Sequence, residues 1–224
     1  MKFLLYGVFR NGDRRWPETL RGVGLQAVFL IEKNGLSAAV SKIEDSALTP
    51  NISGALAYER VLGSIHRTGT VIPMRFGSVF ESKLQIAGFL EEHRKHYAEL
   101  LTELEGSTEM GVRILLKDAA PQPPSAPRSG VGYLATQRRR YAQVDEIAAE
   151  QERISRRIRR LVSGLFLKSK SERSLVEGYR HLSLHFLVSR NSVKSFRTAF
   201  RRVELCPRAK LFLSGPWPPH NFVS

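Results

Sequence analysis

The second half of the chain alternates between strand-like and helix-like segments in an order that restricts its fold. Hydrophobic patterning predicts a strand at 110–117, a helix at 131–167, a strand pair within 174–189, a helix at 191–203 and a strand at 209–214. This βαββαβ order is typical of a ferredoxin-like domain. The sequence therefore predicts an α+β protein whose C-terminal domain is ferredoxin-like, with an extended long helix.

The first half predicts a separate, mixed α+β domain. Asn34-Gly35 stands between two apolar runs and is a strong signal for a tight hairpin, because both residues tolerate the positive φ of a type I′ turn. Gly106 is expected to end the last helix of this half. The expected elements are strands at 2–9, 25–31 and 36–43 and helices at 52–67 and 81–105.

We place the domain boundary near Gly106 and not at the proline-rich segment that follows. The segment 119–130 holds four of the eleven prolines and reads as a loop or semi-rigid linker, but the ferredoxin-like order needs the strand before it. The predicted domains are 1–105 and 106–215, followed by a C-terminal tail, 216–224, that packs between them.

The stretch TVIPMRFGSVF, residues 70–80, is expected to connect these elements at a sheet edge. Pro73 cannot donate a ladder hydrogen bond, which favours an edge strand, and Gly77 permits a positive φ. Arg75 lies between Met74 and Phe76 and is expected near apolar surface. Two interpretations stay open for Arg75: a buried structural arginine in a turn, or a contact to an anion or a partner.

The helix expected at 131–167 has coiled-coil-like periodicity. It also carries many arginines, Arg138, Arg156 and Arg160 among them, which cannot all face a core. Either the helix packs on its own sheet with its arginines in water, or it projects and meets a partner, possible self-association included. The residues spaced by three and four are Val144, Ile147, Gln151, Ile154, Ile158, Leu161 and Leu165.

Charge is concentrated in the second half of the chain. Residues 1–118 hold 15 Lys and Arg against 14 Asp and Glu, a net +1, whereas residues 119–224 hold 20 against 7, a net +13. Such a surface attracts nucleic acid, anionic membrane or an acidic protein. No run has the 18 or so apolar residues of a membrane span. The single cysteine, Cys206, fits a reducing compartment, so we expect a cytoplasmic protein.

Residues that carry catalysis are scarce in this sequence. His181 and His185 lie four apart on a predicted strand, too far from each other to share a metal ion, and Cys206 has no local signature of a nucleophile. No phosphate-binding or dinucleotide-binding glycine motif occurs. We therefore expect no catalytic residues, no metal and no cofactor, and predict that the chain is not an enzyme.

The tail GPWPPHNFVS carries Trp217 and Phe222 on a segment stiffened by three prolines. Two aromatic rings on a stiff arm have a large area to bury at small cost in conformational entropy. The arm is expected to fold back between the domains, against the 75–77 turn. Docking into a partner's groove is the alternative.

Four segments together resemble the gas vesicle protein F/L family (GvpF/GvpL). TVIPMRFGSVF resembles that family's VLPxRFGTVF, and LFLSGPWPPHNFV resembles its GPWPPYSFV tail, with His220 and Asn221 in place of Tyr and Ser. GVGYLATQR, containing Tyr133 and Arg138, is similar to the family's GxxYLxxR. LAYERVL resembles its LxxHxxVL helix, although Tyr58 stands where histidine is expected.

The resemblance implies a non-enzymatic structural or assembly protein of gas vesicles. Its implied partners are the major gas vesicle shell protein and other accessory vesicle proteins, with no specific nucleic acid. The alternative is a basic nucleic-acid-binding module, although neither MGVRILLK nor HLSLHFLV supplies the stacking aromatics of an RNA-recognition domain. The expected structural or interaction residues are Arg75, Phe76, Gly77, Tyr133, Arg138, Arg156, Arg160, Trp217 and Phe222.

Overall fold

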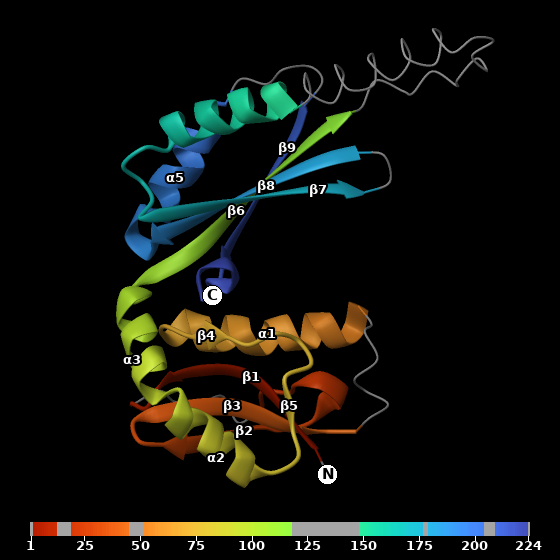
Figure 1. The fold of residues 1–224 in the computed structure, drawn as a ribbon, viewed down its shortest axis with the longest axis vertical. Coiled ribbons are helices and arrows are strands. Elements are labelled where there is room, and N and C mark those ends of the chain that lie inside the picture. The colour runs from red at the N-terminus through yellow and green to blue at the C-terminus, as the bar shows by residue number, and fades with distance from the viewer. Residues whose placement is uncertain are drawn as a thin grey trace, which may run out of the picture. The chain divides into compact units, whose positions relative to one another are not determined.

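The computed structural model describes residues 2–12, 19–44, 52–117, 148–176, 179–203 and 209–223. Contacts within the chain divide it into two compact units. Unit 1 comprises Met1–Glu109 and Pro216–Ser224, and unit 2 comprises Met110–Gly215. Each unit has its own sheet and helices, so the fold is α+β (Figure 1).

The sheet of unit 1 is built around β1 (Lys2–Arg10). Its strand order is β2-β3-β1-β4, and β5 also pairs with β1. The pairs β1–β3, β2–β3 and β1–β4 are antiparallel. The edge position predicted for Pro73 is confirmed, because β4 is the last strand of this order. The other strands are β2 (Val28–Lys33), β3 (Leu36–Ile43), β4 (Ile72–Pro73) and β5 (Val79–Phe80).

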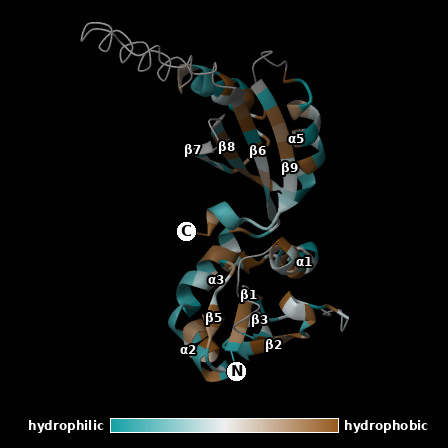
Figure 2. Cartoon of the chain, turned by 90° about the vertical axis from the view of Figure 1, so that its right-hand side faces the viewer, coloured by the Kyte–Doolittle hydropathy of each residue, from teal (hydrophilic) through white to brown (hydrophobic). Residues whose placement is uncertain are grey.

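Helices cover both faces of this sheet, which explains why β1 is apolar without alternation. Residues 3–9 of β1 are all buried. α1 (Ile52–Thr68) lies on one side of the strands, and α2 (Lys83–Glu92) and α3 (Arg94–Glu103) lie on the other (Figures 1 and 2).

The predicted hairpin between β2 and β3 is confirmed. Asn34 has φ +48° and Gly35 has φ +84°, the positive values that such a two-residue turn needs. The prediction for the preceding strand was wrong at its start. Leu25 belongs to a 3-10 turn, η1 (Val23–Leu25), with φ +58°, and β2 begins only at Val28.

The single helix predicted over 81–105 is in fact two helices that meet at His93. This residue has φ −95° and ψ 6°, outside the helical range. Its ring Nδ1 lies 2.9 Å from the carbonyl oxygen of Phe89, and the ring stacks on Tyr97 at 5.4 Å between centroids. Gly106, with φ +66°, follows α3 as expected.

The sheet of unit 2 has the strand order β7-β8-β6-β9. β7 and β8 form a long antiparallel hairpin in register from Lys168–Leu187 to Val176–Tyr179. β6 begins three residues earlier than predicted, β9 ends three residues later, and the hairpin begins at Lys168 instead of residue 174. The strands are β6 (Ser107–Lys117), β7 (Lys168–Val176), β8 (Tyr179–Ser189) and β9 (Ala209–Trp217).

Two helices of unit 2 pack on one face of this sheet. Residues 148–161 are helical, and the turn containing Gly164 (φ +77°) separates them from β7, so the predicted helix end at 167 was too late. α5 (Val193–Phe200) follows a 3-10 turn, η3 (Arg190–Ser192), and is shorter than predicted. The shared core contains Met110, Val112, Ile114, Ile158, Val162, Leu182, Leu184, Phe186, Val188 and Phe196.

Candidate interaction surfaces

The turn at 75–77 is positioned by hydrogen bonds to β1. The amide of Met74 donates to the carbonyl of Tyr6 at 2.9 Å, and the amide of Leu5 donates to the carbonyl of Ser78 at 2.9 Å. Ser78 closes the turn by donating from its amide and hydroxyl to the carbonyl of Arg75. Gly77 has φ +92°, which an L side chain rarely adopts.

The structure corrects the expectation that Arg75 is buried. Its side chain is exposed, whereas Phe76 is half-buried. Phe76 packs edge-on against the ring of Tyr58, with centroids 5.3 Å apart. Phe76 and Gly77 therefore shape this turn, and the Arg75 side chain lies on its surface.

Tyr58 joins three segments of unit 1 through its hydroxyl. It is 2% exposed, and its Oη lies 2.7 Å from the carbonyl of Met74, 3.0 Å from that of Tyr6 and 3.3 Å from that of Leu5. A phenol has one proton to donate, and the shortest contact places it on Met74. Tyr58 thus fastens α1 to β1 and to the 70–80 stretch.

Burial raises the pKa of Tyr58 well above its usual value of 10.0, and the nearby Glu59 and Tyr6 raise it further. Burial also raises the pKa of Tyr6, against hydrogen bonds from Ser41 and the Val23 amide that lower it. Unit 1 therefore holds two phenols in the neutral form beyond the pH at which the unfolded chain ionises.

This burial predicts a loss of stability in alkali. Above about pH 10 the unfolded chain releases phenol protons that the folded unit retains, so the free energy of unfolding falls as pH rises. We expect Tyr58→Phe to make this decline shallower between about pH 10 and 11. Equilibrium unfolding in urea at each pH measures the free energy of unfolding of the natural chain and of Tyr58→Phe. An identical decline in the two proteins would contradict the raised pKa of Tyr58.

The tail is held to unit 1 by buried polar groups near the start of β6. The carboxylate of Glu109, which is 4% exposed, accepts hydrogen bonds from the Asn221 amide at 2.9 Å and from Asn221 Nδ2 at 2.6 Å. The Thr108 hydroxyl donates to the carbonyl of Trp217 at 2.9 Å. His66 Nε2 lies 3.0 Å from the Thr108 hydroxyl oxygen. Because the hydroxyl proton is used on Trp217, the Nε2–H of His66 donates to this oxygen.

The two aromatic residues of the tail behave differently. Phe222, in the 3-10 turn η4 (His220–Phe222), is 6% exposed, as expected of an anchoring ring. Trp217 is 46% exposed, so its expected burial was wrong. His220 Nε2 lies 3.5 Å from a carboxylate oxygen of Glu59 on α1. The bridging role of the tail stays a prediction.

The apolar side chains of the helix of residues 148–161 pack inside unit 2. Ile158 is fully buried and Ile154 is partly buried against the same core, so the described part of the seam faces its own sheet. Of the two interpretations left open for this helix, packing on its own sheet holds for these positions. Gln151 is buried too. Val144 and Ile147 lie outside the described residues.

The exposed side of this helix carries several arginines, some of which form ion pairs with glutamates. Arg156 and Arg160 are exposed. Arg156 Nε lies 3.8 Å from Glu152, which also accepts from Arg173 at 3.1 Å, and Arg153 pairs with Glu150. Exposed pairs of this kind contribute little to stability. Tyr133 and Arg138 lie outside the described residues.

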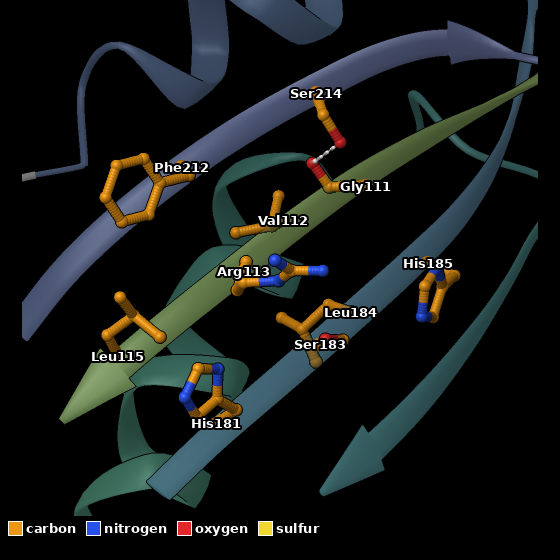
Figure 3. Close-up of a pocket in the computed structure, with 10 residues that line it drawn as sticks. All are labelled: Gly111, Val112, Arg113, Leu115, His181, Ser183, Leu184, His185, Phe212 and Ser214. Atoms are coloured by element: carbon orange, nitrogen blue, oxygen red, sulfur yellow. Dashed lines mark hydrogen bonds between the residues drawn. The ribbon is translucent and has the colours of Figure 1, made fainter. Parts of the chain in front are cut away.

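The face of the unit 2 sheet opposite its helices carries a hollow of about 470 Å³ (Figure 3). Arg113, His181, His185 and Phe212 line it from β6, β8 and β9. The sequence placed His181 and His185 on a strand, too far apart to share a metal ion, but did not predict the hollow, which residues of β6, β8 and β9 line together. Within the described ranges no cluster of three metal-ligating side chains occurs.

Glu109 and Thr108, which hold the tail, were not predicted from the sequence. The signal was the carboxylate of Glu109 directly before the mostly apolar run MGVRILLK, where a buried charge needs a partner. Among the described helices, none is long and apolar enough to cross a membrane.

Comparison with known proteins identifies relatives along the whole chain. The family described as gas vesicle synthesis protein GvpL/GvpF matches residues 2–224. Gas vesicle protein F of a Streptomyces species is 26% identical, with 100% of both chains covered. Gas vesicle protein F1 of Halobacterium salinarum is 26% identical over 97% of this chain and 91% of its own.

Solved structures share the fold. GvpF from Microcystis aeruginosa superposes with a TM-score of 0.78 at 15% identity, covering 100% of this chain and 99% of that one. GvpF from Anabaena gives a TM-score of 0.75 at 18% identity, covering 100% and 98%. At these identities the likeness speaks for the fold alone.

Proposed function

This chain belongs to the gas vesicle GvpL/GvpF family, whose members take part in gas vesicle formation, and we propose that it acts there by binding the major gas vesicle shell protein. In this proposal it also binds other accessory vesicle proteins. It keeps shell subunits soluble or nucleates the shell, and it does so without catalysis. The family match along residues 2–224 is the observation that carries the proposal.

The distribution of charge supports a binding role for unit 2. From the sequence, unit 2 holds 22 Lys and Arg against 8 Asp and Glu, a net +14, whereas unit 1 holds 13 of each. The electrostatic field of a unit with this net charge speeds association with a partner of opposite charge. Arg156, Arg160 and Trp217 are exposed, and we assign them to partner contact together with Arg75.

We also propose that unit 2 is a ferredoxin-like domain. Its elements follow in the order β6, the helix of residues 148–161, β7, β8, α5 and β9, which agrees with βαββαβ. The strand order β7-β8-β6-β9 supports the same assignment, since it places the first and third strands in the centre.

Co-expression with the major shell protein tests the proposed function. We expect the tagged chain to capture the shell protein at about 150 mM salt, where exposed charges more than about 8 Å apart are largely screened. The alternative function is binding of single-stranded nucleic acid, which the basic charge of unit 2 favours. Such binding uses phosphate contacts and depends steeply on salt. RNA in the eluate without shell protein would contradict the proposal.

A further inference from the structure

The sheet of unit 2 has two chemically different faces. On β6, Val112 and Ile114 point into the core shared with the helix of residues 148–161 and α5. Arg113 alternates with them and is exposed. Because successive side chains of a strand point to opposite faces, the residues with the parity of Arg113 form a second face. Among the described residues, neither helix contributes to the hollow on that face.

Gly111 on β6 and Ser214 on β9 lie side by side at one end of the hollow. A Cβ at this position would lie 2.8 Å from Ser214 Oγ, closer than side chains tolerate. Ser214 Oγ instead lies 3.4 Å from the Gly111 carbonyl. Figure 3 shows Arg113 between β6 and β8, with Phe212 and Leu115 toward the other end of the strands. The hollow therefore has a cation, Arg113, beside the apolar side chains of Phe212 and Leu115.

Every titratable residue that lines the hollow is basic: Arg113, His181 and His185, with no carboxylate among the lining residues. The unit around it has a net charge of +14. Phe212 is 52% exposed, so its ring is accessible to a ligand that enters the hollow. Cationic and apolar groups side by side select a ligand that carries carboxylates next to apolar side chains.

We propose that this hollow binds an extended acidic peptide segment of a partner protein, with a carboxylate on Arg113 and an apolar side chain on Phe212 and Leu115. The guanidinium fork of arginine matches a carboxylate with two parallel hydrogen bonds. β9 is the last strand in the order of this sheet, so an extended segment can add beside it. In such a segment alternate side chains face the hollow, which suits alternating acidic and apolar residues.

An acidic peptide fits these contacts better than single-stranded RNA. Recognition of RNA on a sheet uses two or three stacked bases on aromatic rings. Phe212 is the single Phe, Tyr or Trp among the residues that line the hollow, and its neighbour Leu115 is aliphatic. This inference does not rest on binding of the shell protein, because the peptide is tested directly.

The test is titration calorimetry of the full chain with a synthetic peptide of alternating glutamate and leucine at about 150 mM salt. We expect Arg113→Glu to weaken binding at least about tenfold, the effect of losing a charge-assisted hydrogen bond. Lys194→Glu is the matched control. It changes the net charge equally but lies exposed on α5, on the opposite face of the sheet, and should change affinity less than about twofold.

A second variant separates the apolar contact from charge. Phe212→Ala should weaken the peptide about fivefold while leaving the net charge unchanged, because an exposed ring that binds ligand loses its buried area. A peptide with glutamine in place of glutamate should not bind detectably. Equal weakening by Arg113→Glu and Lys194→Glu, no binding by the intact chain, or tighter binding of oligouridine than of the acidic peptide would each overturn the proposal.

Discussion

Tyr58→Ala will lower the free energy of unfolding of unit 1 by about 3–5 kcal/mol, the range for removing a large buried aromatic side chain. The substitution removes the ring between Tyr6 and Phe76, whose centroids lie 5.1 and 5.3 Å from it. It also leaves the carbonyl of Met74 without the phenol proton. Hydrogen exchange of the β1 amides measures the loss in unit 1 without assuming that both units unfold together.

Leu56→Ala is the matched control for this substitution. Leu56 lies on the same helix, two residues earlier, and is exposed, so its loss should change stability by no more than about 0.5 kcal/mol. Tyr58→Phe keeps the ring and removes only the hydroxyl, and an intermediate cost of about 1–3 kcal/mol is expected. If Tyr58→Ala lowered the free energy of unfolding no more than Leu56→Ala, the packing of α1 on β1 would not depend on Tyr58.

Glu109→Ala will release the tail from unit 1. The carboxylate accepts two hydrogen bonds from Asn221, and hydrogen bonds to a charged group are each worth about 1.5–3 kcal/mol. Without them the Asn221 amide loses its acceptor, and the ring of Phe222 loses the contact that positions its turn. We expect the Asn221 and Phe222 amides to exchange at least about tenfold faster and the tail to become sensitive to protease.

Glu99→Ala is the control for the tail, since Glu99 is an exposed carboxylate on α3 and its removal changes the net charge equally. Glu109→Gln retains one acceptor oxygen and should protect the tail partially. Unchanged exchange at Asn221 in Glu109→Ala would show that the prolines and Phe222 hold the tail by themselves.

Local signals were read correctly from the sequence because they act within a few residues. Asn34-Gly35 specified the β2–β3 hairpin through backbone conformation alone, and Pro73 marked an edge strand through its missing donor. The resemblance to the GvpF/GvpL family was confirmed along nearly the whole chain, since the segments that carry it are spread over both halves.

Contacts between distant segments were beyond the sequence. Tyr58 was noted only as a departure from histidine, and its bond to the Met74 carbonyl follows from how α1 crosses β1. Arg75 was expected near apolar surface because its neighbours are apolar. In the structure its side chain is exposed, whereas those of Met74 and Phe76 are half-buried. The basic hollow depends on which side chains of β6, β8 and β9 lie next to one another, and the order of the elements does not specify this.

Capture of the major gas vesicle shell protein is the measurement that tests the central claim most directly. The intact chain and a chain ending at Ser214 are each co-expressed with the shell protein and purified at about 150 mM salt. The account predicts capture by the intact chain, and reduced capture by the truncated chain, which lacks the exposed Trp217. Failure of the intact, folded chain to retain any shell protein would contradict the account.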